Sequence, residues 1–137
     1  MPFRSPLIAL AIACLGGCAN IPGTEQHLLE NTLEHYSTAI RWGNLEEAAA
    51  FVDPETLKAH PLTALDIERY HQVRVTTYNE QQAHFVAEHE VHQSVEIGIV
   101  NVNTQSARSF IDNQVWHYDT KEKRWWLVSG LPNITGH

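Results

Sequence analysis

A chain of 137 residues, 43% hydrophobic and 18% charged, has the composition of one folded domain and not of a disordered segment. Its 16 acidic and 9 basic residues give a formal net charge of −7 with histidine neutral. A surface of that sign repels phosphate groups, which argues against nucleic-acid binding and against attachment to anionic lipids through basic residues.

The N-terminal segment is predicted to be a signal peptide. Arg4 supplies positive charge, and residues 7–15 form an apolar run of signal-peptide length. That run is too short to span a bilayer, which takes about 20 residues. Residues 15–18 (Leu-Gly-Gly-Cys) resemble the lipobox of bacterial lipoprotein precursors. The resemblance implies cleavage between Gly17 and Cys18 and attachment of acyl chains such as palmitate to Cys18. An ordinary secretory signal with a chance cysteine is the alternative.

The residue after the expected lipidation site bears on location. In Gram-negative lipoproteins an aspartate there favours the inner membrane, so Ala19 implies the periplasmic side of the outer membrane. The only cysteines are Cys14 and Cys18, so the folded domain is expected to contain neither a free thiol nor a disulfide. We therefore expect three segments: a signal peptide at residues 1–17, a lipidated tether at 18–23 and a single domain at 24–137.

The first half of the domain is predicted to be helical. One apolar stripe with helical spacing indicates a helix capped by Thr24 and ended by Gly43. Asn44 and then Asp53, which precedes a proline, are typical first residues of two further helical pieces. Helical structure is therefore expected over about residues 24–65. The stripe consists of Leu29, Leu33, Tyr36 and Ile40.

The second half is predicted to form strands from about Ile67 to residue 129, because Thr, Val, Tyr, Phe and Trp alternate with turn clusters. A first strand ends at a polar turn over residues 79–82. Apolar residues of one parity from Phe85 to Ile99 indicate one long strand, which Gly98 would bend or bulge. A third strand over 110–118 and a fourth over 125–128 complete an antiparallel meander.

Helices followed by a meander define an α+β fold. Residues 36–49 (Tyr-x-x-Ala-Ile-x-x-Gly-Asn-x-x-x-Ala-Ala), followed by Asp53, Pro54 and a tryptophan-rich hairpin, resemble the NTF2-like superfamily, a cystatin-like α+β cone. The resemblance implies a curved four-stranded sheet around the helices, with an open end able to hold a small ligand. It selects no function, because the superfamily contains enzymes, ligand binders and structural modules.

The nine histidines raise the question of a metal site. His84, Glu90 and His92 share a strand face with Glu88, but along an unbroken strand His84 and His92 would be about 26 Å apart. Glu90 and His92 alone provide too few ligands. We therefore expect a solvated strand face and neither a metal nor another cofactor. His89 has the opposite parity and is expected to be a hydrogen-bonded core residue.

The resemblance implies that any catalytic acid or base would lie deep in the cone, where Tyr36, Asp112, His117 and Tyr118 have suitable side chains. Asp112 falls beside aromatic residues, which would raise its pKa. The chain has no nucleophile elbow, phosphate-binding glycine loop or metalloprotease motif. We therefore assign no catalytic residue.

The late hairpin carries Trp116, Trp125 and Trp126. Trp125 and Trp126 point to opposite faces of the sheet, since strand side chains alternate. One is expected in the core. The other, with Tyr118 or Trp116, would form an exposed aromatic patch or the mouth of a pocket. Cross-strand aromatic packing is the alternative.

Together these features favour a non-enzymatic, periplasm-facing outer-membrane lipoprotein that binds another protein of the envelope. A small apolar ligand bound in the cone is the first alternative, and an isomerase- or dehydratase-like enzyme is the second. A filled core with an exposed tryptophan patch favours partner binding. A large apolar cavity favours ligand binding, and a large cavity with a buried carboxylate favours an enzyme. The sequence leaves the oligomeric state open.

Overall fold

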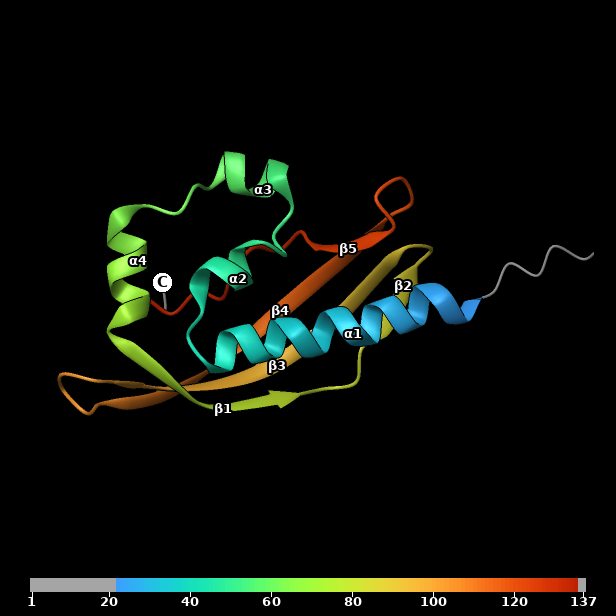
Figure 1. Cartoon of the computed structure of the whole chain (residues 1–137). Helices are drawn as coiled ribbons and strands as arrows, with labels where there is room; N and C mark the ends of the chain where they lie inside the picture. The colour runs from blue at the N-terminus through green and yellow to red at the C-terminus, as the bar shows by residue number, and fades with distance from the viewer. Residues whose placement is uncertain (1–21, 136–137) are drawn as a thin grey trace, which may run out of the picture.

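The computed structural model describes residues 22–135, in which helices precede an antiparallel sheet (Figure 1). This confirms the predicted α+β class. The expected signal peptide, Cys18 and most of the tether lie outside the described residues. Within the described range, no helix is long and apolar enough to cross a membrane. The elements are α1 (Pro22–Arg41), α2 (Leu45–Ala49), α3 (Pro54–Ala59), α4 (Ala64–His71), β1 (Val73–Glu80), β2 (His84–Ala87), β3 (Glu90–Asn101), β4 (Ala107–Asp119) and β5 (Arg124–Leu127).

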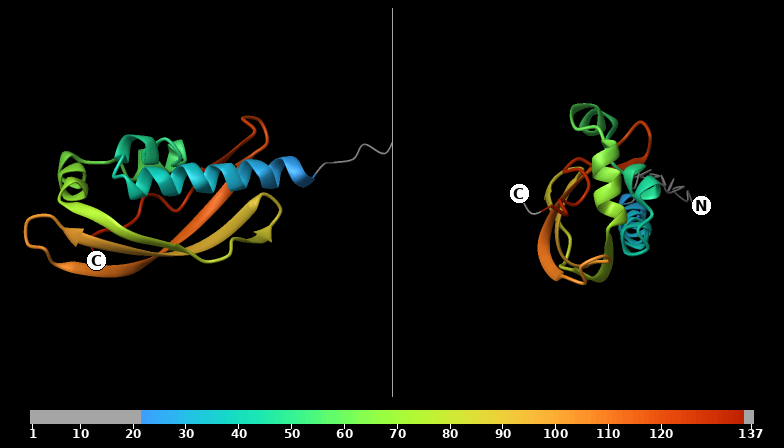
Figure 2. Two further views of the ribbon diagram at one scale, coloured as in Figure 1. Left: turned by 60° about the horizontal axis from the view of Figure 1, so that its bottom comes forward. Right: turned by 90° about the vertical axis from the view of Figure 1, so that its left-hand side faces the viewer.

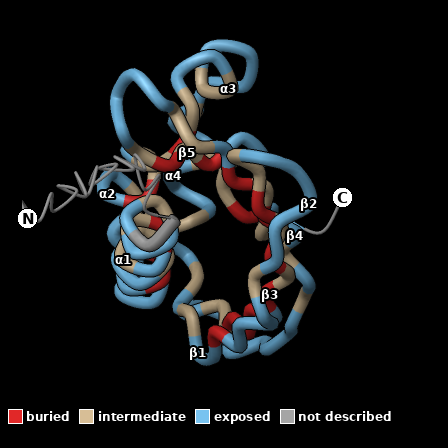
Figure 3. Tube along the Cα trace, turned by 90° about the vertical axis from the view of Figure 1, so that its right-hand side faces the viewer, coloured by how far each residue is buried: buried red, intermediate tan, exposed pale blue. Residues whose placement is uncertain are grey.

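The sheet is built around the long strands β3 and β4, which pair from Glu90 opposite His117 to Val100 opposite Ala107. Strand β5 continues the sheet beyond β4, while β1 and β2 both pair with β3. The sheet curls into a half-barrel, and α1 lies along its concave side (Figures 2 and 3). The predicted antiparallel sheet is therefore present in the order β1-β3-β4-β5, with β2 as an additional strand that pairs with β3.

The core lies between α1 and the concave face of the sheet. Leu29, Tyr36 and Ile40 of the predicted stripe are buried, and Leu33 is half-buried. Tyr36 packs edge-to-face against Trp116 of β4, with ring centroids 5.2 Å apart. Burying each such apolar side chain stabilises the fold by roughly 1.5–3 kcal/mol. The sheet contributes Val91, Val95, Ile97, Ile99, Trp116, Trp125 and Leu127 to the core.

The predicted starts of the second and third helices are confirmed, whereas the predicted cap of the first is wrong, because α1 begins at Pro22 and Thr24 lies inside it. The side chains of Asn44 and Asp53 accept hydrogen bonds from the backbone of the residue three positions later. Gly43 follows α1 with a positive φ of 69°, the backbone conformation that glycine adopts without strain. The N-terminal half is thus divided by the capping residues that its sequence supplies.

The predicted start of the strands at Ile67 is wrong, because α4 continues to His71. Thr63 and Asp66 form a complete capping box: Asp66 N–H donates to Thr63 Oγ1 at 3.1 Å, and Thr63 N–H donates to Asp66 Oδ2 at 3.0 Å. The Asp66 carboxylate accepts hydrogen bonds from the Thr63 backbone N–H and from the Thr63 hydroxyl, and these lower the pKa of Asp66. The capping box therefore starts a helix that extends into residues whose composition favours strands.

The predicted long strand from Phe85 to Ile99 is also wrong, since the chain reverses at Glu88 and His89 to form the hairpin β2–β3. His89 has a positive φ of 62°, a conformation in which histidine is enriched among non-glycine residues. Phe85 consequently lies opposite Val91. The reversal brings together side chains that an unbroken strand would hold far apart.

Gly98 lies at a close approach between β3 and β1. Its partner is Thr77, and the register of β1 shifts between Val75 and Thr77, so β1 carries the irregularity. A Cβ atom at Gly98 would collide with the hydroxyl of Thr77 and lie 2.9 Å from Thr76 Oγ1. The absence of a side chain at Gly98 thus lets the sheet bend at this point.

Replacing Gly98 with alanine should lower the free energy of unfolding by about 1–3 kcal/mol, because the new methyl group has no space. Thr77→Ala in the same chain should restore part of the loss by removing the nearest hydroxyl. Urea denaturation measures both effects. Ile111→Ala is the control, since this exposed side chain on β4 should cost under about 0.5 kcal/mol. A Gly98→Ala variant as stable as this control would contradict the close approach.

Candidate functional site

A buried polar cluster occupies the concave face of the sheet beneath α1. Gln114 is 1% exposed, and its Nε2 donates hydrogen bonds to Tyr78 Oη (2.9 Å) and to Asp112 Oδ2 (3.0 Å). Trp116 Nε1 donates to Gln114 Oε1 at 3.1 Å. We call Tyr36, Tyr78, Asp112, Gln114 and Trp116 the Asp112 cluster. It includes three of the pocket residues predicted from the sequence: Tyr36, Asp112 and Trp116.

Burial dominates the electrostatics of this cluster. It raises the pKa of Asp112, while the hydrogen bond from Gln114 opposes part of that rise. It also raises the pKa of Tyr36, to which the nearby Asp112 adds. The Tyr36 hydroxyl is buried and has no hydrogen-bond partner among residues 22–135. Burial likewise raises the pKa of Tyr78 and of Tyr70, whose hydroxyl donates to the Pro132 carbonyl.

A half-buried carboxyl with a raised pKa is suited to acid–base chemistry only if a substrate reaches it. Neither Asp112 nor Gln114 lines any of the cavities described below. Gln114 also uses its hydrogen bonds within the protein: it donates to Tyr78 and Asp112 and accepts from Trp116. The geometry therefore gives the Asp112 cluster the character of a polar core.

The other predicted aromatic residues lie at the end of the sheet near the first turns of α1. They are Tyr118, Trp125 and Trp126. Trp125 is 1% exposed, and its Nε1 donates to the Glu25 carbonyl at 3.0 Å. Tyr118 packs against Trp125 with ring centroids 5.3 Å apart. Trp126 is on the opposite face of β5, where the Arg124 guanidinium lies 3.6 Å from its ring centroid. We call this end of the half-barrel, near the first turns of α1, the closed end, because aromatic side chains fill it.

The histidines of the β2–β3 hairpin are arranged differently from the prediction. His84 is the direct cross-strand partner of His92, with ring centroids 6.3 Å apart, so the expected separation of about 26 Å along one strand is wrong. His92 Nε2 lies 2.8 Å from Glu90 Oε1. Even so, among residues 22–135 no three histidine, aspartate or glutamate side chains gather in a way that could hold a metal ion.

His89 connects the hairpin turn to α1. Its Nδ1 lies 2.8 Å from Glu25 Oε1, its Nε2 lies 3.5 Å from Glu88 Oε1, and its ring packs on Tyr118. The hydrogen bond to Glu25 raises the pKa of His89, and the charge of Glu88 adds to that rise. His89 is therefore hydrogen-bonded as predicted, at the rim of the core and not inside it.

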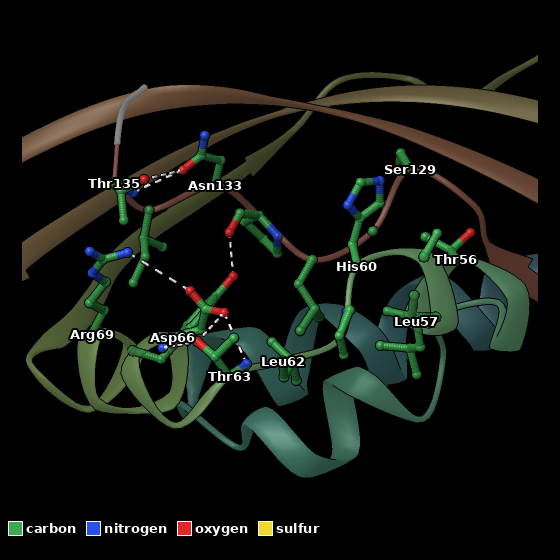
Figure 4. A pocket seen from close by; sticks show the side chains of 18 residues that line it. Thr56, Leu57, His60, Leu62, Thr63, Asp66, Arg69, Ser129, Asn133 and Thr135 are labelled. Atoms are coloured by element: carbon green, nitrogen blue, oxygen red, sulfur yellow. Dashed lines mark hydrogen bonds and ion pairs between the residues drawn. The ribbon is translucent and has the colours of Figure 1, made fainter.

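Three adjoining cavities open at the opposite end of the half-barrel, around the C-terminal end of α1, α4 and the turn between β3 and β4. We call this the open end. The largest cavity, about 540 Å³, lies between α3, α4 and residues 129–135, and Figure 4 shows Asp66 and Arg69 on one side of it and Asn133 and Thr135 on another. Ile134 lines all three cavities. The C-terminal segment therefore forms a wall common to them.

The second cavity is the most apolar and has a volume of about 260 Å³. Trp42 stands at its edge and is 84% exposed, the most exposed of the large hydrophobic side chains in the described part of the chain. The sequence did not single out Trp42, because its exposure depends on where α1 ends relative to the sheet. The cavity is lined by aliphatic and aromatic side chains that include Ile40, Val73, Val75, Ile97, Ile99 and Phe110.

No protein-family model matches this chain, and no similarity to a curated protein or to a solved structure is found. The helices and curled antiparallel sheet are compatible with a cone-like α+β fold.

The contact between His89 and Glu25 predicts a pH-dependent stability. Since the pKa of His89 is raised in the fold, its contribution is complete below the unfolded value of about 6.5 and is lost as the pH rises through the folded value. His89→Asn keeps a residue that tolerates positive φ. Urea denaturation should show a larger stability difference between parent and variant at pH 6 than at pH 9. His71→Asn, an exposed control, should show no such trend. Equal differences at both pH values would contradict the assignment.

Proposed function

We propose that this chain is a non-enzymatic binding module, lipid-anchored through Cys18 on the periplasmic side of the outer membrane, that captures a partner protein of the envelope at its open end. We also propose that it is a divergent NTF2-like domain, on the strength of the residue 36–49 pattern and the half-barrel. The observation that carries the proposal is the exposed Trp42 beside an apolar cavity.

An exposed tryptophan next to a concave apolar surface is typical of a protein-binding hot spot. The indole offers a large, rigid contact area, and the adjoining cavity of about 260 Å³ can accept an apolar side chain. Surface apolar residues are common singly, but here exposure and concavity coincide at one place. This coincidence favours binding at the open end.

The expected position of the lipid anchor also favours binding at the open end. If the lipid is on Cys18, the four peptide steps to Pro22 span at most about 14 Å. The 20 residues of α1 then extend about 30 Å along the helix axis. Trp42 follows the last turn of α1, so the open end would face away from the membrane, while the closed end would lie close to it. A partner in the periplasm would meet the open end first.

Two alternatives remain distinguishable. A small apolar ligand would use the same cavity, and its apolar lining favours that candidate. An enzyme is less consistent with the geometry, because the Asp112 cluster lines none of the cavities described. The exposure of Trp42 beside the apolar cavity favours a protein partner over a small ligand.

Site-specific photo-crosslinking in intact envelopes tests the proposal. A photo-reactive residue at position 42 should capture a defined protein, identified by mass spectrometry, whereas one at Val86, an exposed apolar residue of β2, should not. With that partner purified, Trp42→Ala should weaken binding by about 2 kcal/mol, or roughly 30-fold. Crosslinking from position 86 but not from 42 would contradict the proposal.

A separate experiment tests the proposed lipid anchor. Cys18→Ala should abolish incorporation of labelled palmitate and release the protein from membranes, since the acidic domain offers no basic surface for attachment. The purified Cys18→Ala protein should bind the partner as the parent does. Retention of that variant on outer membranes in high salt would exclude the proposed anchor.

A further inference from the structure

Two arginines line the third cavity at the open end. It has a volume of about 390 Å³ and is lined by polar side chains, among them Arg69, Gln72, Asn101 and Arg108. It shares Val73, Ile99 and Ile134 with the apolar cavity beside Trp42. An apolar compartment and a basic one thus adjoin each other across common walls.

Both arginines are available to a ligand. Arg108 makes no ion pair among the described residues, and its guanidinium lies 5.5 Å from the ring centroid of Phe110. Phe110 itself lines the apolar cavity, so the cation stands at the boundary of the two compartments. Arg69 Nη1 approaches Asp66 Oδ1 only to 3.9 Å, and the Arg69 side chain is 46% exposed. A long, exposed pair of this kind is weak.

The positive charge of the two arginines makes the third cavity favour an anionic ligand. The chain carries a net charge of −7, so most of its surface repels anions. Two guanidinium groups on one cavity, with amide and hydroxyl donors around them, form a local exception that suits a carboxylate. The adjoining apolar cavity requires that this carboxylate be attached to an apolar group.

We propose that the open end captures the C-terminus of the partner protein, with the partner's last side chain apolar and seated beside Trp42 and its terminal carboxylate bound by Arg69 and Arg108. This rests on the proposed function and specifies which part of the partner is recognised. A chain terminus places a carboxylate one Cα away from an apolar side chain, which matches two cavities that share walls. The apolar cavity has room for a side chain and not for a long acyl tail.

Defined peptides test this directly. The full-length protein in lipid nanodiscs is titrated with a fluorescent Gly-Ser-Gly-Phe peptide that has a free C-terminal carboxylate, and with the same peptide as its C-terminal amide. Fluorescence anisotropy should show at least about tenfold tighter binding of the free acid, because only the acid forms charge-assisted hydrogen bonds with the arginines.

Variants separate the two compartments. The double variant with Arg69→Gln and Arg108→Gln should reduce binding of the acid to the level of the amide, whereas Trp42→Ala should weaken both peptides alike. Lys58→Gln is the matched control, since Lys58 is an exposed cation with its own 3.9 Å acidic neighbour on α3. All these side chains are largely exposed, so the variants should fold, and thermal melts verify this.

Each outcome decides the inference. Equal affinity for acid and amide, no binding of either, or no effect of the two arginine substitutions would overturn it. Displacement of the acid peptide by equimolar decanoate would overturn it in favour of a small amphiphile. If the acid and the amide bind equally, a crosslinked partner protein whose binding still requires Trp42 would leave the proposed function intact.

Discussion

The edge-to-face contact between Tyr36 of α1 and Trp116 of β4 is the constraint on which the architecture depends. Both side chains are fully buried, and their ring centroids lie 5.2 Å apart. The contact fixes how deeply α1 sits in the half-barrel. On one side of it, Trp125 and Tyr118 fill the space between helix and sheet. On the other side no ring pair of this kind lies between α1 and the sheet among the described residues, and cavities remain. The placement of aromatic pairs along one core therefore closes one end and leaves the other open.

The Asp112 cluster follows from the same contact. Trp116 and Tyr78 bring an indole N–H and a hydroxyl into the core, and Gln114 satisfies both while also donating to Asp112. The hydrogen bonds among these four residues favour one arrangement of the strands, while the Tyr36 hydroxyl of the same cluster has no partner among the described residues. We interpret Asp112 and Gln114 as determinants of how β1 and β4 pack under α1. The proposed binding site is at the open end and does not involve these two residues.

The fold class was predictable because the signals are local: Asp53 with its following proline, the glycine after α1 and the parity of the strands each depend on a few neighbouring residues. The reversal at Glu88 and His89 was not predictable from parity. In this hairpin Phe85 lies opposite Val91, both odd-numbered, so alternation continues unchanged through the turn. The capping box of Thr63 and Asp66 was present in the sequence and would have extended the helical half.

The candidate site was less predictable. Tyr36, Asp112 and Trp116 were predicted as pocket or interaction residues; they lie together beneath α1 but line none of the cavities described. The exposure of Trp42 and the adjoining cavities arise from the meeting of α1, β1, β4 and the C-terminal segment around Ile134, which lie far apart in the chain. No local pattern specifies such a junction.

The central claim is that one end of the half-barrel is filled and the other is open. Urea denaturation of two single variants, Trp125→Ala and Trp42→Ala, tests it most directly. Removing the buried indole at the closed end should cost about 3–5 kcal/mol, because it leaves a large cavity. Removing the exposed indole at the open end should change the free energy of unfolding by less than about 0.5 kcal/mol. Equal losses for the two variants would contradict the account.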